Sequence, residues 1–160
     1  MTTVFGIMEV NLVSARGLKN NEFWGGGIDP YVLIQYRGQE RKSSTIRAGQ
    51  GSKPEWNEKF TFKIEYPSVD GQYKLILKLM DHDTFSSDDY LGEATIYLKE
   101  FLEVGLEKGR AEIHPKKYSV VGSDQCYCGE IQVGITFTPK KATHDVEEEY
   151  GGWKESNDYS

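Results

Sequence analysis

The chain has 160 residues, which is enough for one domain with a proper core but too few for two domains of ordinary size. Seven Phe, ten Tyr and three Trp supply bulky core material, which argues against disorder over most of the length. The 19 Lys and Arg are outnumbered by 25 Asp and Glu, and the formal charge of −6 has the wrong sign for a protein whose main task is to grip nucleic acid. We expect one folded domain without an overall basic surface.

Apolar and polar residues alternate repeatedly along the chain, which is typical of half-buried antiparallel strands. In chain order, the strands are expected to include residues 8–12, 31–36, 41–47, 60–64, 75–79, 91–98, 116–121 and 131–137. A helical pattern is scarce and is expected only at 98–104, before Gly105. The sequence therefore predicts an all-β domain, an eight-stranded antiparallel β-sandwich.

The last stretch of the chain differs from the rest. Residues 140–160 lose the alternation, become polar and carry three Lys against six Asp or Glu, half of the net charge of the chain. We expect residues 1–139 to form the domain and 140–160 to form a flexible acidic tail.

The terminal and cysteine patterns bear on location. No apolar run is long enough to span a membrane, and the N-terminus has no charged segment followed by an apolar one, so neither a membrane span nor a signal peptide is expected. The two cysteines, Cys126 and Cys128, are one residue apart, where a disulfide would close a tiny strained ring. A reduced, cytoplasmic protein is expected.

The segment from Asp81 to Gly92 carries four carboxylates in one loop between two expected strands. Close carboxylates repel one another by roughly 1 kcal/mol per pair even in a high dielectric, and a divalent cation relieves that repulsion. Asp and Ser are also ordinary turn residues, so a solvated turn is the alternative interpretation. An EF-hand is excluded, because counting from Asp81 places Ser86 and Gly92 where that loop needs Gly and Glu.

A second loop, residues 20–29, also joins two expected strands and offers the carboxylates of Glu22 and Asp29. The two loops can meet at one end of a sandwich. Together they predict a calcium site that neither loop forms alone.

At these residues the chain resembles the C2 domain family. The resemblance depends on Ile28-Asp29-Pro30-Tyr31-Val32, on residues 54–62 with Trp56 at their centre, and on the Asp81-x-Asp83 loop with Asp89 and Gly92. These motifs occur in the family's order and cover about residues 4–138. Within the family the chain is most similar to the small plant single-C2 proteins of the elicitor-responsive and phloem-protein type.

The resemblance implies a C2 sandwich of the permuted type II topology, in which loops at one end bind two or three Ca2+ ions and then anionic phospholipid. By position, the implied ligands are Asp29 from the first loop and Asp81, Asp83 and Asp89 from the second, with Asp88 and a hydroxyl of Ser86 or Ser87 at the periphery and carbonyls of Asn21 and His82 completing the shells. Glu22 stands where the family has an aspartate, so an altered site is expected.

Three aromatic residues lie between these carboxylates: Phe23 and Trp24 in the first loop and Phe85 in the second. They are expected to enter the membrane once calcium has neutralised the loops, although they could also fold back over their own loops. Basic residues cluster in sequence around the third and fourth strands, where the family often has a second, basic lipid site, and Arg41 and Lys42 are assigned to that site. The expected function is a monomeric, calcium-dependent phospholipid-binding module that is recruited from the cytoplasm to the plasma membrane.

The sequence also bears on two other classes of function. Catalysis is not expected, because no G-x-S-x-G, P-loop or H-E-x-x-H motif frames the three histidines. A phloem-type carrier of RNA or protein cargo, or a protein-interaction module using the basic face, is the alternative, although the net negative charge speaks against RNA.

Overall fold

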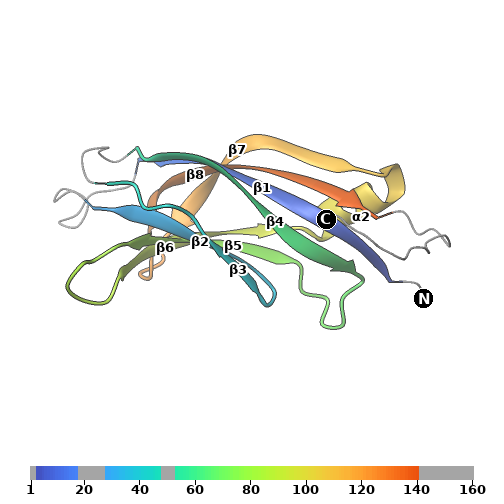
Figure 1. Cartoon of the computed structure of the whole chain (residues 1–160), viewed down its shortest axis with the longest axis horizontal. Helices are drawn as coiled ribbons and strands as arrows, with labels where there is room; N and C mark the ends of the chain where they lie inside the picture. The colour runs from blue at the N-terminus through green and yellow to red at the C-terminus, as the bar shows by residue number, and fades with distance from the viewer. Residues whose placement is uncertain (1–2, 18–27, 48–52, 141–160) are drawn as a thin grey trace, which may run out of the picture.

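The computed structural model describes residues 3–17, 28–47 and 53–140. Within these ranges it contains antiparallel strands and one helix (Figure 1). The strands are β1 (Val4–Arg16), β2 (Pro30–Tyr36), β3 (Gln39–Lys42), β4 (Glu55–Tyr66), β5 (Lys74–Asp81), β6 (Asp89–Tyr97), β7 (Ala111–Val121) and β8 (Tyr127–Pro139), and the helix is α2 (Lys99–Lys108). The predicted all-β architecture of eight antiparallel strands is confirmed.

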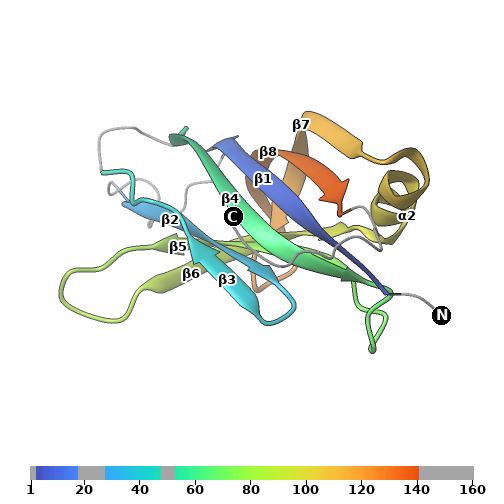
Figure 2. The same ribbon diagram turned by 45° about the vertical axis from the view of Figure 1, so that its right-hand side comes forward.

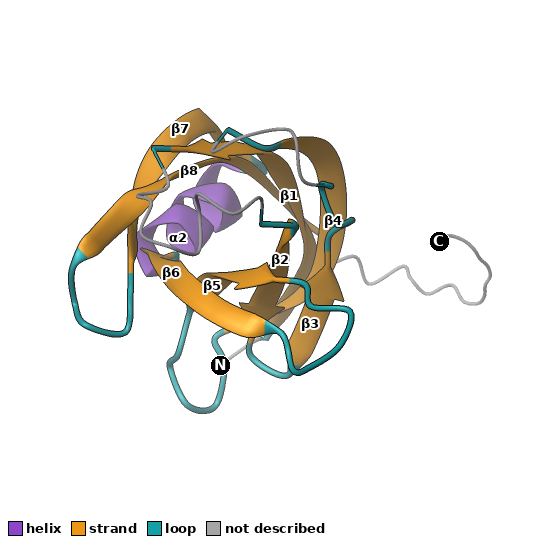
Figure 3. Cartoon of the chain, turned by 90° about the vertical axis from the view of Figure 1, so that its left-hand side faces the viewer, coloured by secondary structure: helices purple, strands orange, loops and turns teal. Residues whose placement is uncertain are grey.

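The strands follow one another in the order β3-β2-β5-β6-β7-β8-β1-β4. A single residue pair, Glu93 with Val121, joins β6 to β7, so the sheet divides there into two four-stranded layers. Viewed along the long axis, the layers curl around a common interior (Figure 3). The permuted connectivity of the C2 fold stays a prediction.

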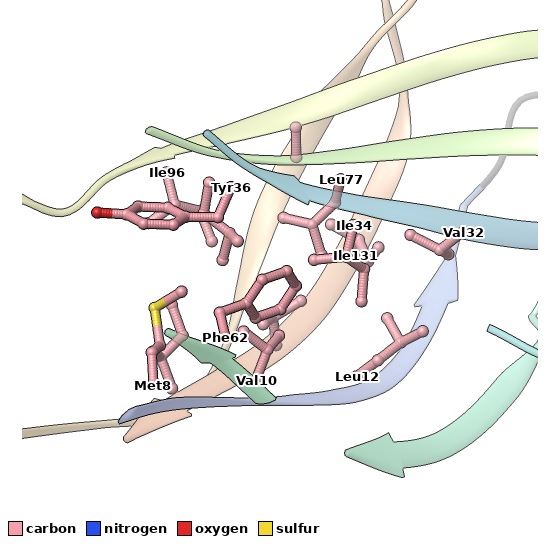
Figure 4. Close-up of a cluster of buried hydrophobic side chains, with 14 of the residues drawn as sticks. Met8, Val10, Leu12, Val32, Ile34, Tyr36, Phe62, Leu77, Ile96 and Ile131 are labelled. Atoms are coloured by element: carbon pink, nitrogen blue, oxygen red, sulfur yellow. The ribbon is translucent and has the colours of Figure 1, made fainter. Parts of the chain in front are cut away.

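The core is formed by the apolar residues of the period-two pattern, whose side chains point inward. Met8, Val10 and Leu12 of β1 are fully buried, and they face Ile34 and Leu77 of the opposite layer (Figure 4). The alternation continues on β4, where Phe62 and Ile64 are buried while Lys63 and Glu65 are exposed. Because side chains of a strand point alternately to its two faces, the period-two pattern identified this core correctly.

Helix α2 is longer than predicted. The sequence indicated an end before Gly105, but the helix continues to Lys108 and ends at Gly109, whose φ of 87° is left-handed. Gly105 instead packs against Phe137, because a Cβ atom at position 105 would lie 2.5 Å from Phe137 Cδ2. Gly105 is therefore required by close packing and does not terminate the helix.

Strand β3 is shorter than predicted. The sequence predicted a strand over 41–47, but β3 begins two residues earlier, at Gln39, and ends at Lys42. At the next position the Ser43 N–H still donates to the Val32 carbonyl at 2.9 Å, but the Val32 N–H donates to the Ser43 hydroxyl at 2.8 Å. Past this point only isolated bonds to β2 continue, such as Ile46 N–H to the Pro30 carbonyl.

Side chains close the open side of the sandwich between the edge strands β3 and β4. The Gln39 amide donates to the Lys63 carbonyl at 2.7 Å and accepts the Lys63 N–H at 2.8 Å. Arg41 Nε donates to the Thr61 carbonyl at 3.1 Å. These bonds satisfy edge groups that otherwise offer a template for another strand.

The helix content also bears on membrane insertion: within the described ranges, no helix has the length and apolar character that a membrane span requires.

Tyr36 has a hydroxyl that the core does not use. The side chain is 0% exposed, and in the described part of the chain its hydroxyl has no hydrogen-bond partner (Figure 4). Burial raises the Tyr36 pKa to about 12. An unsatisfied buried polar group costs about 1–3 kcal/mol.

Tyr36→Phe is therefore expected to leave the free energy of unfolding unchanged or to increase it, as measured by urea denaturation. Tyr73→Phe is the matched control, because the Tyr73 hydroxyl accepts the Ser68 N–H at 2.9 Å. That variant is expected to lose about 1 kcal/mol. An equal loss in both variants would contradict the assignment of Tyr36 as an unpaired hydroxyl.

Candidate metal centre at the ends of β2, β5 and β6

Three aspartates lie at adjacent strand ends. Asp81 ends β5, where it is opposite Pro30 of β2 on one side and Asp89 of β6 on the other. Asp29 immediately precedes β2, and its N–H donates to Asp81 Oδ1 at 2.9 Å, while His82 N–H donates to the Asp29 carbonyl at 2.9 Å. Since neighbouring strands are about 4.8 Å apart, this pairing brings the carboxylates of Asp29, Asp81 and Asp89 to one end of the sheet.

Asp83 and Asp88 shape the loop between β5 and β6. Asp83 Oδ1 accepts the N–H groups of Phe85 and Ser86 at 2.8 and 3.2 Å, and its Oδ2 accepts the Ser86 hydroxyl at 2.8 Å. Asp88 accepts the Asp83 N–H at 2.9 Å and the Tyr31 hydroxyl. These bonds hold the loop in a turn that carries both carboxylates.

The carboxylates differ in their electrostatics. Burial raises the pKa of Asp81, and the nearby charges of Asp29, Asp89 and Asp83 raise it further. The Phe85 N–H and the Ser86 hydroxyl lower the pKa of Asp83, and the Tyr31 hydroxyl, followed by the Asp83 N–H, lowers that of Asp88. The charged form of Asp81 is thus disfavoured, first by burial and then by the neighbouring charges, while Asp83 and Asp88 are stabilised in their charged forms.

The signs of these shifts predict how stability responds to pH. The Asp81 contribution is present below its unfolded pKa and is lost as the pH rises through its raised folded pKa. The contributions of Asp83 and Asp88 are present above their unfolded pKa values and are lost as the pH falls through their lowered folded ones. At neutral pH, therefore, the negative charge of Asp81 lowers the free energy of unfolding.

The arrangement suits a hard cation in its chemistry, because the donors are carboxylate oxygens, which Ca2+ prefers. Across residues 3–17, 28–47 and 53–140, however, no set of three His, Cys, Asp or Glu side chains is already arranged to hold a metal ion. Glu22, the other predicted carboxylate, lies outside the described residues. The described residues at this end of the sheet thus bring carboxylate donors close enough to repel one another. They do not form a complete coordination shell by themselves.

The predicted lipid-binding residues fall in different places. Phe85 is 96% exposed at the tip of the β5–β6 loop, while Phe23 and Trp24 lie outside the described residues. The structure does not bring Arg41 and Lys42 together, because successive residues of a strand point to opposite faces. The Arg41 guanidinium lies 5.1 Å from the centre of the Phe62 ring, whereas Lys42 Nζ lies 4.6 Å from that of Tyr31.

The sequence interpretation missed Tyr31. Its hydroxyl binds Asp88 and therefore ties the β5–β6 loop to β2, and burial together with this bond raises the Tyr31 pKa to about 12. The sequence offered one indication of its role: Tyr31 lies two residues after Asp29 and therefore at the same end of the sheet. Which loop residue it reaches depends on the pairing of β2 with β5.

Comparison with known proteins assigns the family. A family model described as the C2 domain matches residues 6–117, and the chain belongs to this family. It is 50% identical over 151 residues to 16 kDa phloem protein 1 of Arabidopsis thaliana and 52% identical over 153 residues to Elicitor-responsive protein 1 of Oryza sativa subsp. japonica, in each case covering 94% of this chain and 96% of the relative. The solved structure of a C2 domain-containing protein shares 37% identity and superposes with a TM-score of 0.68, covering 90% of this chain and 97% of that one.

Proposed function

We propose that this C2 domain binds Ca2+ at the ends of β2, β5 and β6 and that the ion then brings the domain to anionic phospholipid. The observation that carries the proposal is the gathering of Asp29, Asp81 and Asp89 at three adjacent strand ends, where burial raises the Asp81 pKa and the neighbouring charges raise it further. A cation bound there relieves a repulsion that the fold otherwise has to bear.

The proposed ligands are Asp29, Asp81, Asp83 and Asp89, with Glu22 supplying a further carboxylate. Asp88 is already bound by the Tyr31 hydroxyl and belongs to the periphery. Each Ca2+ supplies two positive charges and accepts hard oxygen ligands. Two or three ions offset much of the negative charge of the two loops, which otherwise repels anionic lipid, so calcium acts as an electrostatic switch.

Vesicle co-sedimentation tests the proposal. The full chain is mixed with vesicles of phosphatidylserine and phosphatidylcholine, or of phosphatidylcholine alone, first with Ca2+ and then with excess chelator. The expected result is sedimentation with the anionic vesicles in calcium and release by the chelator. Vesicle binding that persists in excess chelator would contradict calcium dependence. Equal binding to neutral vesicles would contradict recognition of the anionic headgroup.

Substitution of Phe85 tests whether an apolar side chain contributes to membrane binding in addition to the ion. Phe85→Ala is expected to weaken calcium-dependent vesicle binding by on the order of 1.5 kcal/mol, about tenfold, because less apolar area enters the membrane. Val69→Ala is the matched control, because Val69 is 99% exposed in the β4–β5 turn. Titrations at physiological and high salt separate the two forces, since screening weakens electrostatic docking more than apolar insertion.

Unchanged vesicle binding by Phe85→Ala would reject the anchor and leave the ion as the link to the headgroups. Phe23→Ala and Trp24→Ala extend the same test to the first loop. Calcium affinity measured without lipid is expected to stay the same in all three variants, because none replaces a proposed ligand.

A further inference from the structure

A groove lies on the closed side of the sandwich, away from the aspartates. Its volume is ≈ 520 Å³, and its lining comes from the β2–β3 hairpin, β4 and β1. Its lining includes Phe5, Arg37, Gln39, Arg41, Lys63 and Glu65. The groove therefore combines charged walls with an aromatic ring from the neighbouring strand β1.

Two of its cations are not balanced by the described part of the chain. Arg37 pairs with Asp70, but Arg41 donates to the backbone carbonyls of Thr61 and Glu40 and forms no ion pair with a described carboxylate. Lys63 likewise forms no ion pair within the described ranges. Glu65 is the opposing charge in the lining. Beside these groups, Phe5 is 55% exposed, which leaves its ring available to an apolar partner.

The described chain ends, at Lys140, next to this groove. Pro139, the last residue of β8, is opposite Gly6, and the Lys140 N–H donates to the Phe5 carbonyl at 2.7 Å. Strand β1 in turn separates β8 from β4 (Figure 2). Two strand spacings, about 10 Å, thus separate Lys140 from the β4 side of the groove.

The sequence beyond Lys140 matches the groove in charge and in length. Residues 145–149, which we call the acidic segment, contain Asp145, Glu147, Glu148 and Glu149. Seven residues from Lys140 to Glu147 can span up to about 23 Å, more than twice the distance required. Val146 and Tyr150 offer apolar side chains in the same stretch.

We propose that the acidic segment binds in this groove of its own chain, with its carboxylates at Arg41 and Lys63 and an apolar neighbour against Phe5. The groove is then an intramolecular docking site, and any other anion must displace the segment to enter it. The proposal does not depend on calcium, because neither the groove nor the segment includes a proposed calcium ligand.

Carbodiimide coupling of the full chain tests the contact, because this reagent joins a lysine amine directly to a carboxylate. After isolation of the monomer, mass spectrometry is expected to find peptides that link Lys63 to the acidic segment. Lys108 is the internal control: it is exposed and also close to Lys140, since Ala111 pairs with Phe137. Coupling of the segment to Lys108 as often as to Lys63, or to Lys63 only in covalent dimers, would overturn the proposal.

Nuclear magnetic resonance supplies the second measurement. The full-chain variant Glu147→Gln/Glu148→Gln/Glu149→Gln is expected to shift the amide signals of Phe5, Gln39 and Lys63, while those of the Asp83–Asp89 loop stay in place. High salt added to the unaltered chain is expected to shift the groove signals in the same direction, since screening weakens the contact. Groove signals that do not differ between the variant and the unaltered chain would overturn the proposal.

Discussion

Asp81→Asn is expected to raise the melting temperature of the calcium-free domain and to remove most of the stabilisation that calcium gives. The first effect follows because Asp81 is partly buried beside Asp29, Asp83 and Asp89, which raises its pKa and makes its charged form unfavourable in the fold. The second follows because the same carboxylate lies between two other proposed ligands. One substitution is thus expected to move stability in opposite directions with and without the ion.

The calcium effect sets the scale of this experiment. A ligand at 100 times its dissociation constant adds about 2.7 kcal/mol of stability, and most of that increment is expected to disappear in Asp81→Asn. Differential scanning calorimetry with calcium and with chelator measures both effects. The gain in the calcium-free variant is expected to shrink as the pH falls, because the wild-type carboxyl is then protonated in the fold as well.

Asp70→Asn is the matched control at the other end of the domain. The Gln72 N–H and the Arg37 guanidinium lower the Asp70 pKa to about 2, so this carboxylate favours the fold when it is charged. The control is expected to lower calcium-free stability, an effect that is lost as the pH falls toward 2, and to keep the full calcium response. A calcium response in Asp81→Asn equal to that of Asp70→Asn would exclude Asp81 as a ligand.

Gly6→Ala is expected to destabilise the domain by about 3 kcal/mol, a large fraction of the stability of a small domain. A Cβ atom at position 6 would lie 2.8 Å from both the Pro139 Cα and the Thr138 carbonyl oxygen, and 2.7 Å from the Phe137 ring. Backbone atoms of a paired strand cannot rotate away, so β8 has to move relative to β1. Chemical denaturation with fluorescence detection measures the loss.

Gly38→Ala controls for the change of residue type. Position 38 lies in the turn between β2 and β3, and a Cβ atom there would meet no atom within 4 Å. Its free energy of unfolding is expected to stay within about 0.5 kcal/mol of the original. Equal destabilisation by the two substitutions would show that the loss of glycine, rather than the contact with β8, is responsible.

Several features of the domain followed from the sequence by itself. Alternation determined which residues of β1 and β4 face the core, because a strand has a fixed side-chain period of two. The spacing of the carboxylates placed Asp29, Asp81 and Asp89 at the ends of expected strands, and the structure brings these three strand ends together. The C2 family also followed from the motifs, and the comparisons confirm it. The roles of Glu22, Phe23 and Trp24 stay predictions outside the described residues.

Other features depended on which strands become neighbours. The bond from Tyr31 to Asp88 joins residues 57 positions apart, and Gly105 is required by the distant Phe137 ring. Where β3 ends, the Ser43 hydroxyl accepts the N–H of Val32, a residue 11 positions away. The position of Lys140 beside the β3–β4 groove follows from the arrangement of β4, β1 and β8. Local patterns encode the period and burial of a strand, but contacts between side chains on different strands are determined only once the register of the sheet is set.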